Sequence, residues 1–113
     1  PINIRFNVKT IINMSVFGDI ISTNKPVLIV FYAGWHYLAK DATDSIQQVA
    51  DSLGDAVRVI KIDIDKNKEL TQKLKINGIP TYMIFHKGEL VWRIEALQPS
   101  ANLINAIKSF IES

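Results

Sequence analysis

The apolar residues of this chain follow two different spacings, and each spacing predicts a different kind of element. Residues 27–32 are apolar without interruption, which is typical of a central strand buried on both faces of a sheet. Over residues 57–64 the odd and even positions form two separate rows, and this two-residue period predicts another strand. Between Gly34 and Leu53 the apolar residues are spaced by three and four, which predicts a long helix that ends at Gly54.

The same two patterns predict the remaining elements. We expect Ser15 to be the N-cap of the helix over residues 14–22 and Ser100 to be the N-cap of the helix over residues 100–111. A serine hydroxyl at this position accepts a hydrogen bond from a free backbone N–H. A hairpin turn is expected at residues 86–88, where a glycine separates two strand patterns. The elements are a strand over residues 8–12, helices over 14–22 and 100–111, a short helix carrying Leu70, Leu74 and Ile76, and strands over 81–86 and 89–94.

The resulting order is β-α-β-α-β-α-β-β-α, which predicts an α/β fold. Strands that alternate with helices form the parallel part of a sheet, and the closing hairpin adds an antiparallel pair. We therefore expect a central mixed sheet flanked by four helices. The 113 residues and 12.7 kDa fit a single domain over residues 1–113, and the hydrophobic fraction of 48% is enough for a core.

Charge and hydropathy exclude several classes of protein. The formal charge of +2 comes from 13 basic and 11 acidic residues, too small an excess to predict nucleic-acid binding. The longest apolar run, residues 27–34, is far shorter than the roughly 20 residues that span a bilayer. We expect a soluble, cytoplasmic protein without a membrane span, while a signal cleaved upstream of Pro1 stays open.

The chain contains no cysteine, and this absence removes a whole branch of chemistry. Disulfides, thiolate metal sites and cysteine nucleophiles are all excluded. The two histidines, His36 and His86, are far apart in the sequence and do not have the spacing of a zinc site. We expect neither a metal nor another cofactor.

Four short segments, in this order, resemble the thioredoxin family over about residues 8–112. They are Lys-Pro-Val-Leu-Ile-Val-Phe-Tyr-Ala at 25–33, Val-Ile-Lys-Ile-Asp-Ile-Asp at 59–65, Gly-Ile-Pro-Thr at 78–81 and Phe-His-Lys-Gly-Glu at 85–89. The resemblance implies the thioredoxin fold, with a cis peptide bond before Pro80.

The active-site segment of that family is Trp-Cys-Gly-Pro-Cys-Lys, whereas residues 35–40 read Trp-His-Tyr-Leu-Ala-Lys. The resemblance implies that His36 and Ala39 stand where the two cysteines would be, and that Val30 replaces a buried aspartate whose lysine partner corresponds to Lys61. Disulfide exchange needs an attacking thiolate and a second thiol. We therefore assign no catalytic residue and expect no thiol–disulfide oxidoreductase activity from the chain itself.

Two charged side chains need new partners if the site has degenerated in this way. Lys61 is expected either to pair with Asp63 on the same strand face or to extend into solvent. Glu95 takes the place of a family glycine opposite the cis-proline. We expect it to pair with Lys40 or to hydrogen-bond His36, with a solvent-directed side chain as the alternative.

The resemblance also implies that the former active-site face binds extended peptide segments. The predicted binding residues are Trp35, His36, Tyr37, Leu38, Ile79, Pro80 and Glu95, with Leu97 beside them. The leading hypothesis is a non-catalytic module that binds a protein, a peptide segment or a second copy of itself. The alternatives are a role in redox homeostasis through a partner that supplies thiols, non-thiol chemistry centred on His36, and an exposed His36 without any role.

Overall fold

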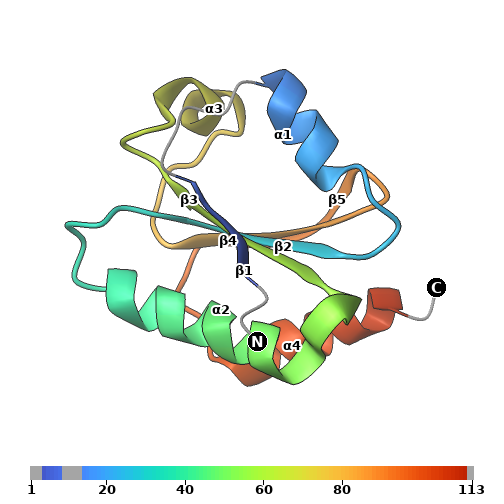
Figure 1. Cartoon of the computed structure of the whole chain (residues 1–113). Coiled ribbons are helices and arrows are strands. Elements are labelled where there is room, and N and C mark those ends of the chain that lie inside the picture. Colours follow the sequence, from blue (N-terminus) through green and yellow to red (C-terminus); the bar gives the residue numbers. More distant parts are fainter. Residues whose placement is uncertain (1–3, 9–13, 112–113) are drawn as a thin grey trace.

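A mixed sheet forms the centre of the protein in a computed structural model that describes residues 4–8 and 14–111 (Figure 1). Its strands are β1 (Ile4–Val8), β2 (Val27–Tyr32), β3 (Arg58–Asp63), β4 (Thr81–His86) and β5 (Glu89–Ile94). They lie in the order β1-β3-β2-β4-β5. β1, β3 and β2 are parallel, β4 is antiparallel to β2, and β5 is antiparallel to β4. This arrangement confirms the predicted mixed sheet.

Helices cover both faces of the sheet. They are α1 (Met14–Ile21), α2 (Ala39–Leu53), α3 (Lys68–Lys73) and α4 (Ser100–Ile111), with a short 3-10 turn, Gly54–Ala56, after α2. Figure 1 shows α1 and α3 on one face and α2 and α4 on the other. The helices were predicted from the spacing of their apolar residues, and all four are present. α3, however, is shorter than predicted: it ends at Lys73 and contains Leu70, whereas Leu74 is its C-cap and Ile76 lies beyond it, after Lys75 with φ 55°.

The apolar run of β2 is buried from both sides, as its lack of alternation predicted. Val27 to Phe31 are each 0% exposed. Leu28 and Val30 belong to the core under α2 and α4, whereas Ile29 packs in the core under α1 and α3. Burial of each such aliphatic side chain contributes about 1.5–3 kcal/mol to the free energy of folding. β2 therefore packs against the helices of both layers, and its end fixes where the chain leaves the sheet.

Two glycine turns follow the prediction. Gly54 has φ 54° where α2 ends, and its N–H bonds to the carbonyl of Ala50. In the hairpin between β4 and β5, Lys87 and Gly88 have φ values of 54° and 82°. Two consecutive residues with positive φ match the twist of the flanking strands.

The first strand begins at Ile4, earlier than the predicted start at Val8. β1 ends at Val8, where the prediction had the strand begin, and residues 9–12 lie outside the described residues. The position of β1 is set by its parallel pairing with β3, which puts Ile4 opposite Val59 and Val8 opposite Ile62. A partner strand about fifty residues away is invisible in the local pattern.

Both predicted serine caps were also wrong. α1 begins at Met14, so Ser15 lies inside its first turn. At α4, the carbonyl of Pro99 accepts the N–H of Asn102 at 3.1 Å, while the Ser100 hydroxyl donates to Oε1 of Gln48 at 2.7 Å. Ser100 therefore links α4 to α2 instead of capping its own helix. Over the described part of the chain, no helix has both the length and the apolar character needed to cross a bilayer.

Candidate functional site

The candidate site is built on the loop between β2 and α2, which reverses direction through consecutive backbone turns. The His36 N–H bonds to the Ala33 carbonyl at 3.0 Å, and the Ala39 N–H bonds to the His36 carbonyl at 3.0 Å. α2 itself begins only at Ala39, later than the sequence pattern suggested. The turns use the residues after Ala33 and place His36 three residues before the first residue of α2.

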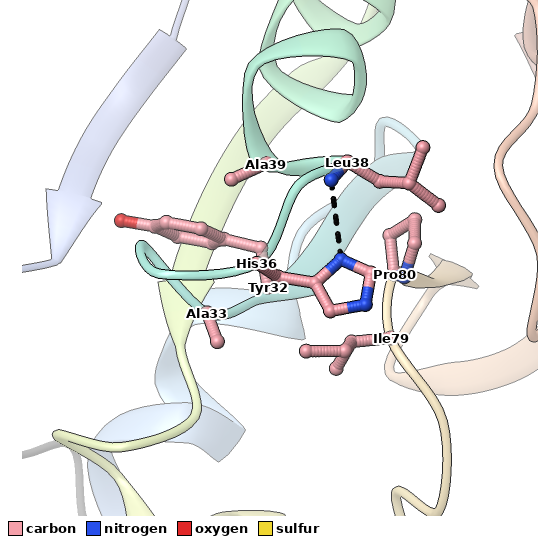
Figure 2. A pocket seen from close by; sticks show the side chains of 7 residues that line it. All are labelled: Tyr32, Ala33, His36, Leu38, Ala39, Ile79 and Pro80. Atoms are coloured by element: carbon pink, nitrogen blue, oxygen red, sulfur yellow. Dashed lines mark hydrogen bonds between the residues drawn. The ribbon is translucent and has the colours of Figure 1, made fainter.

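His36 performs a structural task in this loop. The Leu38 N–H donates to Nδ1 of His36 at 3.2 Å (Figure 2). Leu38 occupies the N-cap position of α2, where no side chain caps the helix. Because an acceptor nitrogen carries no proton, the neutral ring in this geometry has its proton on Nε2. The imidazole thus satisfies a backbone N–H of the helix entrance.

A narrow pocket separates the His36 ring from the loop before β4. Figure 2 shows the ring pointing toward Ile79 and Pro80, and the peptide bond between these two residues is cis. The space has no room for a water molecule. Its walls are Tyr32, Ala33, His36, Leu38, Ala39, Ile79 and Pro80. The structure therefore brings four of the predicted binding residues to one closed contact.

Two aromatic side chains flank this pocket and face solvent. Trp35 is 72% exposed and Tyr37 is 83% exposed, the highest values among the large hydrophobic residues of the described chain. Their rings lie 5.6 Å and 4.7 Å from the ring of His36. The indole N–H of Trp35 is held by Oδ2 of Asp65, at 2.7 Å. Trp35, Tyr37 and the pocket together form what we call the aromatic face.

The predicted partners of Glu95 were wrong. Its Oε1 accepts a hydrogen bond from Arg93 at 3.0 Å, and Lys40 pairs with Asp44 at 2.8 Å. Glu95 and Arg93 are two residues apart at the end of β5, so their side chains leave the strand on the same side. Arg93 is itself fixed, because it donates to the carbonyls of Leu74 and Lys75 at 2.8 Å each. Glu95 is thus kept in an ion pair away from His36.

Lys61 does not pair with Asp63, which was one of its two predicted arrangements. Its Nζ lies 3.4 Å from Oγ1 of Thr43 and 4.9 Å from the centre of the Tyr32 ring. Asp63 instead accepts the backbone N–H of Asp65 at 2.8 Å. Burial raises the pKa of Tyr32, and the Asp63 carboxylate adds to the rise. Lys61 is therefore held by a hydroxyl and a ring face.

Val30, which the family resemblance aligns with a buried aspartate, lies opposite Tyr82 on β4, and both are fully buried. The Tyr82 hydroxyl lies 2.9 Å from Oγ of Ser45 in α2, which also donates to the carbonyl of Ala42. Burial raises the pKa of Tyr82, while its hydrogen bonds to Ser45 and to the Gln98 backbone act in the opposite direction. The polar group of this core is therefore a neutral phenol.

Sequence reasoning missed the Tyr82–Ser45 pair, although each residue carried a signal. Tyr82 brings a hydroxyl into the largely apolar strand of residues 81–85. Ser45 lies next to Ile46 among the buried residues of α2. Neither residue reveals its partner, because 37 positions separate them. A hydroxyl residue in an otherwise apolar, buried row indicates a hydrogen bond inside the core, since a buried polar group is nearly always hydrogen-bonded.

The family model and the most similar curated proteins all point to the same family. The family model described as Thioredoxin matches residues 8–109. The chain is 34% identical over 99 residues to the chloroplastic thioredoxin Y of Oryza sativa, covering 87% of this chain and 59% of that protein. It is also 34% identical over 87 residues to a thioredoxin-like protein of Synechocystis, with 77% and 83% covered. The chain thus spans little more than half of the rice relative, and 21% of a fused thioredoxin reductase/thioredoxin from Mycobacterium leprae.

Solved structures agree with the sequence comparisons. Chloroplastic thioredoxin z superposes with a TM-score of 0.79 at 25% identity, covering 96% of this chain and all of that one. Mitochondrial thioredoxin 3 of Saccharomyces cerevisiae gives 0.77 at 27% identity, with 88% and 93% covered. The sheet order, the loop before α2 and the cis bond at Pro80 are thus found together with a matching family model. Although it lacks every cysteine, this chain belongs to the thioredoxin family.

Proposed function

We propose that this protein is a non-catalytic binding module that takes an extended peptide segment of a partner protein on its aromatic face. The observation that carries the proposal is the exposure of Trp35 and Tyr37 on either side of His36, whose pocket is lined by Ile79 and Pro80, in a chain without any thiol. Large exposed apolar side chains that lie together are typical of interaction sites. Aromatic residues are also enriched where partners bind, because they bury a large area with few rotatable bonds.

The backbone beside the cis bond supports an extended partner. Ile79 is half-buried, and no described residue hydrogen-bonds to its backbone N–H or carbonyl. An extended peptide satisfies such groups by adding main-chain hydrogen bonds, while side-chain pockets supply specificity. Trp35 and Tyr37 then lie where side chains of the bound segment pass.

Chemistry at His36 is a weaker alternative. Its Nδ1 is engaged by Leu38, and the predicted contacts with Glu95 and Lys40 are replaced by other ion pairs. A general base needs an orienting group and a substrate within hydrogen-bond reach. Within the described residues, no carboxylate hydrogen-bonds to the ring of His36. A redox role through a thiol-bearing partner remains the second alternative, and it is suggested by the names of the relatives.

The test compares the wild type with a Tyr37→Glu/Ile79→Glu double variant in quantitative capture of partners from native lysate. Leu90→Glu is the control, because Leu90 is a 47% exposed residue of β5 outside the aromatic face. We expect the double variant to lose the captured proteins, and both Leu90→Glu and His36→Ala to retain them. An insulin reduction assay should show no turnover above the background.

Other results decide against the proposal. Capture that is unchanged in the double variant would exclude the aromatic face, and insulin reduction by the purified chain would restore an enzymatic role. Loss of a detected activity in His36→Ala alone would favour chemistry at that residue. If the captured partner is a second copy of the chain, sedimentation shows a dimer that the double variant does not form. A cytoplasmic location is part of the proposal and is checked by fractionation, since relatives such as the rice protein are chloroplastic.

A further inference from the structure

An open groove lies beside the aromatic face, between α2 and the segment that follows β5. Asp41, Asp44, Ser45 and Gln48 form one wall, and residues 97–100 form the other. The groove measures about 490 Å³, within the usual range of about 300–1,000 Å³ for ligand sites. The pocket at His36, by contrast, does not admit a water molecule. The volume available to a ligand is therefore next to the former active site.

The groove continues directly from the aromatic face. Leu38 lines the His36 pocket, and Asp41, Ser45 and Gln48 line the groove. These positions are separated by three, four and three residues, so they lie in one row along α2. From Asp41 to Gln48 the helix rises about 10 Å, which is the length of about three extended residues. A peptide that leaves the pocket at Leu38 has room to continue along this row.

The walls of the groove are acidic and carry no basic residue. Asp44 is already paired with Lys40, and the hydroxyls of Ser45 and Ser100 are engaged with Tyr82 and Gln48. The carboxylate of Asp41 is exposed, and no described residue donates a hydrogen bond to it. Asp41 also lies at the end of the groove nearest to Leu38. The hydrogen-bonding groups of the groove that have no partner among the described residues thus include the acceptor oxygens of the Asp41 carboxylate.

We infer that the groove binds an arginine side chain of the same extended peptide that occupies the aromatic face. The inference rests on the proposed function and names its partner more closely. A guanidinium donates through a planar fork that matches a carboxylate, and its aliphatic stem packs on apolar surface such as Leu97 and Pro99. The recognised segment is therefore aromatic or aliphatic at the face around Trp35 and carries an arginine a few residues away.

The experiment selects binders from a library of random short peptides displayed on phage. The selection is run on the wild type, on Asp41→Asn, on Asp51→Asn and on the Tyr37→Glu/Ile79→Glu variant. Asp51 is the matched control, because it is an exposed aspartate of α2 outside the groove. We expect wild type and Asp51→Asn to select apolar segments with arginine at a fixed distance. Asp41→Asn should select the same apolar segment without the arginine preference.

One synthetic peptide from the wild-type pool then gives the affinities. Replacing its arginine with citrulline keeps the shape and removes the charge, and we expect the wild type to bind it about tenfold more weakly or worse. Asp41→Asn should bind the arginine and citrulline peptides with equal affinity. In the wild type, raised salt should reduce the difference in affinity between the two peptides. Selected peptides without a basic position, or an arginine preference that survives in Asp41→Asn, overturn the inference and leave the aromatic face intact. A wild type that selects no peptide at all overturns the proposed function itself.

Discussion

Trp35 is exposed but not free, because its indole N–H donates to Oδ2 of Asp65 at 2.7 Å. This bond joins the loop after β2 to the loop after β3 and lies at the surface. The tryptophan is therefore presented to solvent in a fixed orientation. For a binding face this matters, because a side chain that is already ordered loses less conformational entropy when a partner covers it.

Asp65→Ala should release Trp35 while leaving the fold in place. The hydrogen bond is at the surface, so we expect the free energy of unfolding to fall by about 1 kcal/mol or less. The affinity for a bound peptide should fall several-fold because the indole must then be ordered on binding. Acrylamide quenching of tryptophan emission, with Asp51→Ala as the control and Trp35→Phe to isolate the signal of Trp92, measures the change. Identical quenching in Asp65→Ala and wild type would contradict the role of this bond.

Tyr82→Phe removes the buried hydroxyl and leaves Ser45 bonded only to the carbonyl of Ala42. We expect a loss of about 1 kcal/mol in the free energy of unfolding, measured by urea denaturation at neutral pH. In a double-mutant cycle with Ser45→Ala, the two losses should not add, because both substitutions remove the same bond. Strict additivity would show that the two hydroxyls contribute independently.

Stability at alkaline pH should depend on the same tyrosine. Burial raises the pKa of Tyr82 above its ordinary value of 10.0, so the unfolded chain loses this proton first. The stabilising effect is complete below pH 10 and disappears as the pH rises through the folded-state pKa. Tyr82→Phe should therefore lose less stability than the wild type as the pH rises above about 10. The half-exposed Tyr32 makes the same contribution in both proteins, so the difference reports on Tyr82.

Val30→Asp restores the carboxylate that the family resemblance places in this strand. Val30 is 0% exposed in an apolar core, and its neighbour Lys61 would have to leave its contacts with Tyr32 and Thr43 to pair with it. We expect the free energy of unfolding to fall by about 3 kcal/mol or more. Val30→Thr, which adds a hydroxyl without a charge, should cost less. Thermal denaturation of the two variants gives the comparison, and an unchanged melting temperature for Val30→Asp would mean that Lys61 does compensate.

His36→Cys/Ala39→Cys tests how much of the redox frame is retained. The two positions are joined by the bond from the Ala39 N–H to the His36 carbonyl, at the entrance of α2. A helix N-terminus lowers the pKa of a cysteine placed there, and a second thiol resolves the mixed disulfide. We expect the double variant to reduce insulin measurably and each single variant to remain at background. A double variant without turnover would show that the loop geometry has changed as well as its residues.

The elements whose signal is local were predicted well. β2 and β3 were recognisable because each run or alternation reflects burial on the strand itself, and the hairpin at Gly88 follows from its turn residues. The position of the site was also predictable, since residues 35–40 keep the outline of a known motif. That motif correctly placed His36 and Leu38 beside Pro80.

What could not be predicted depends on partners far along the chain. β1 is positioned by β3, Ser100 bonds to Gln48 instead of capping α4, and Tyr82 meets Ser45. Glu95 was assigned to the site because of its position in the motif, whereas its direction is set by Arg93. The groove between α2 and residues 97–100 has no sequence signal, because it is a space between two segments.

The bond between the Leu38 N–H and Nδ1 of His36 has a consequence for how the site responds to its surroundings. An oxidant has no thiol to act on in this chain, and the two methionines, Met14 and Met83, lie in α1 and β4, so no disulfide forms or breaks in this loop. The entrance of α2 is therefore held by a hydrogen bond between two nitrogens, which a change from a reducing to an oxidising compartment leaves in place.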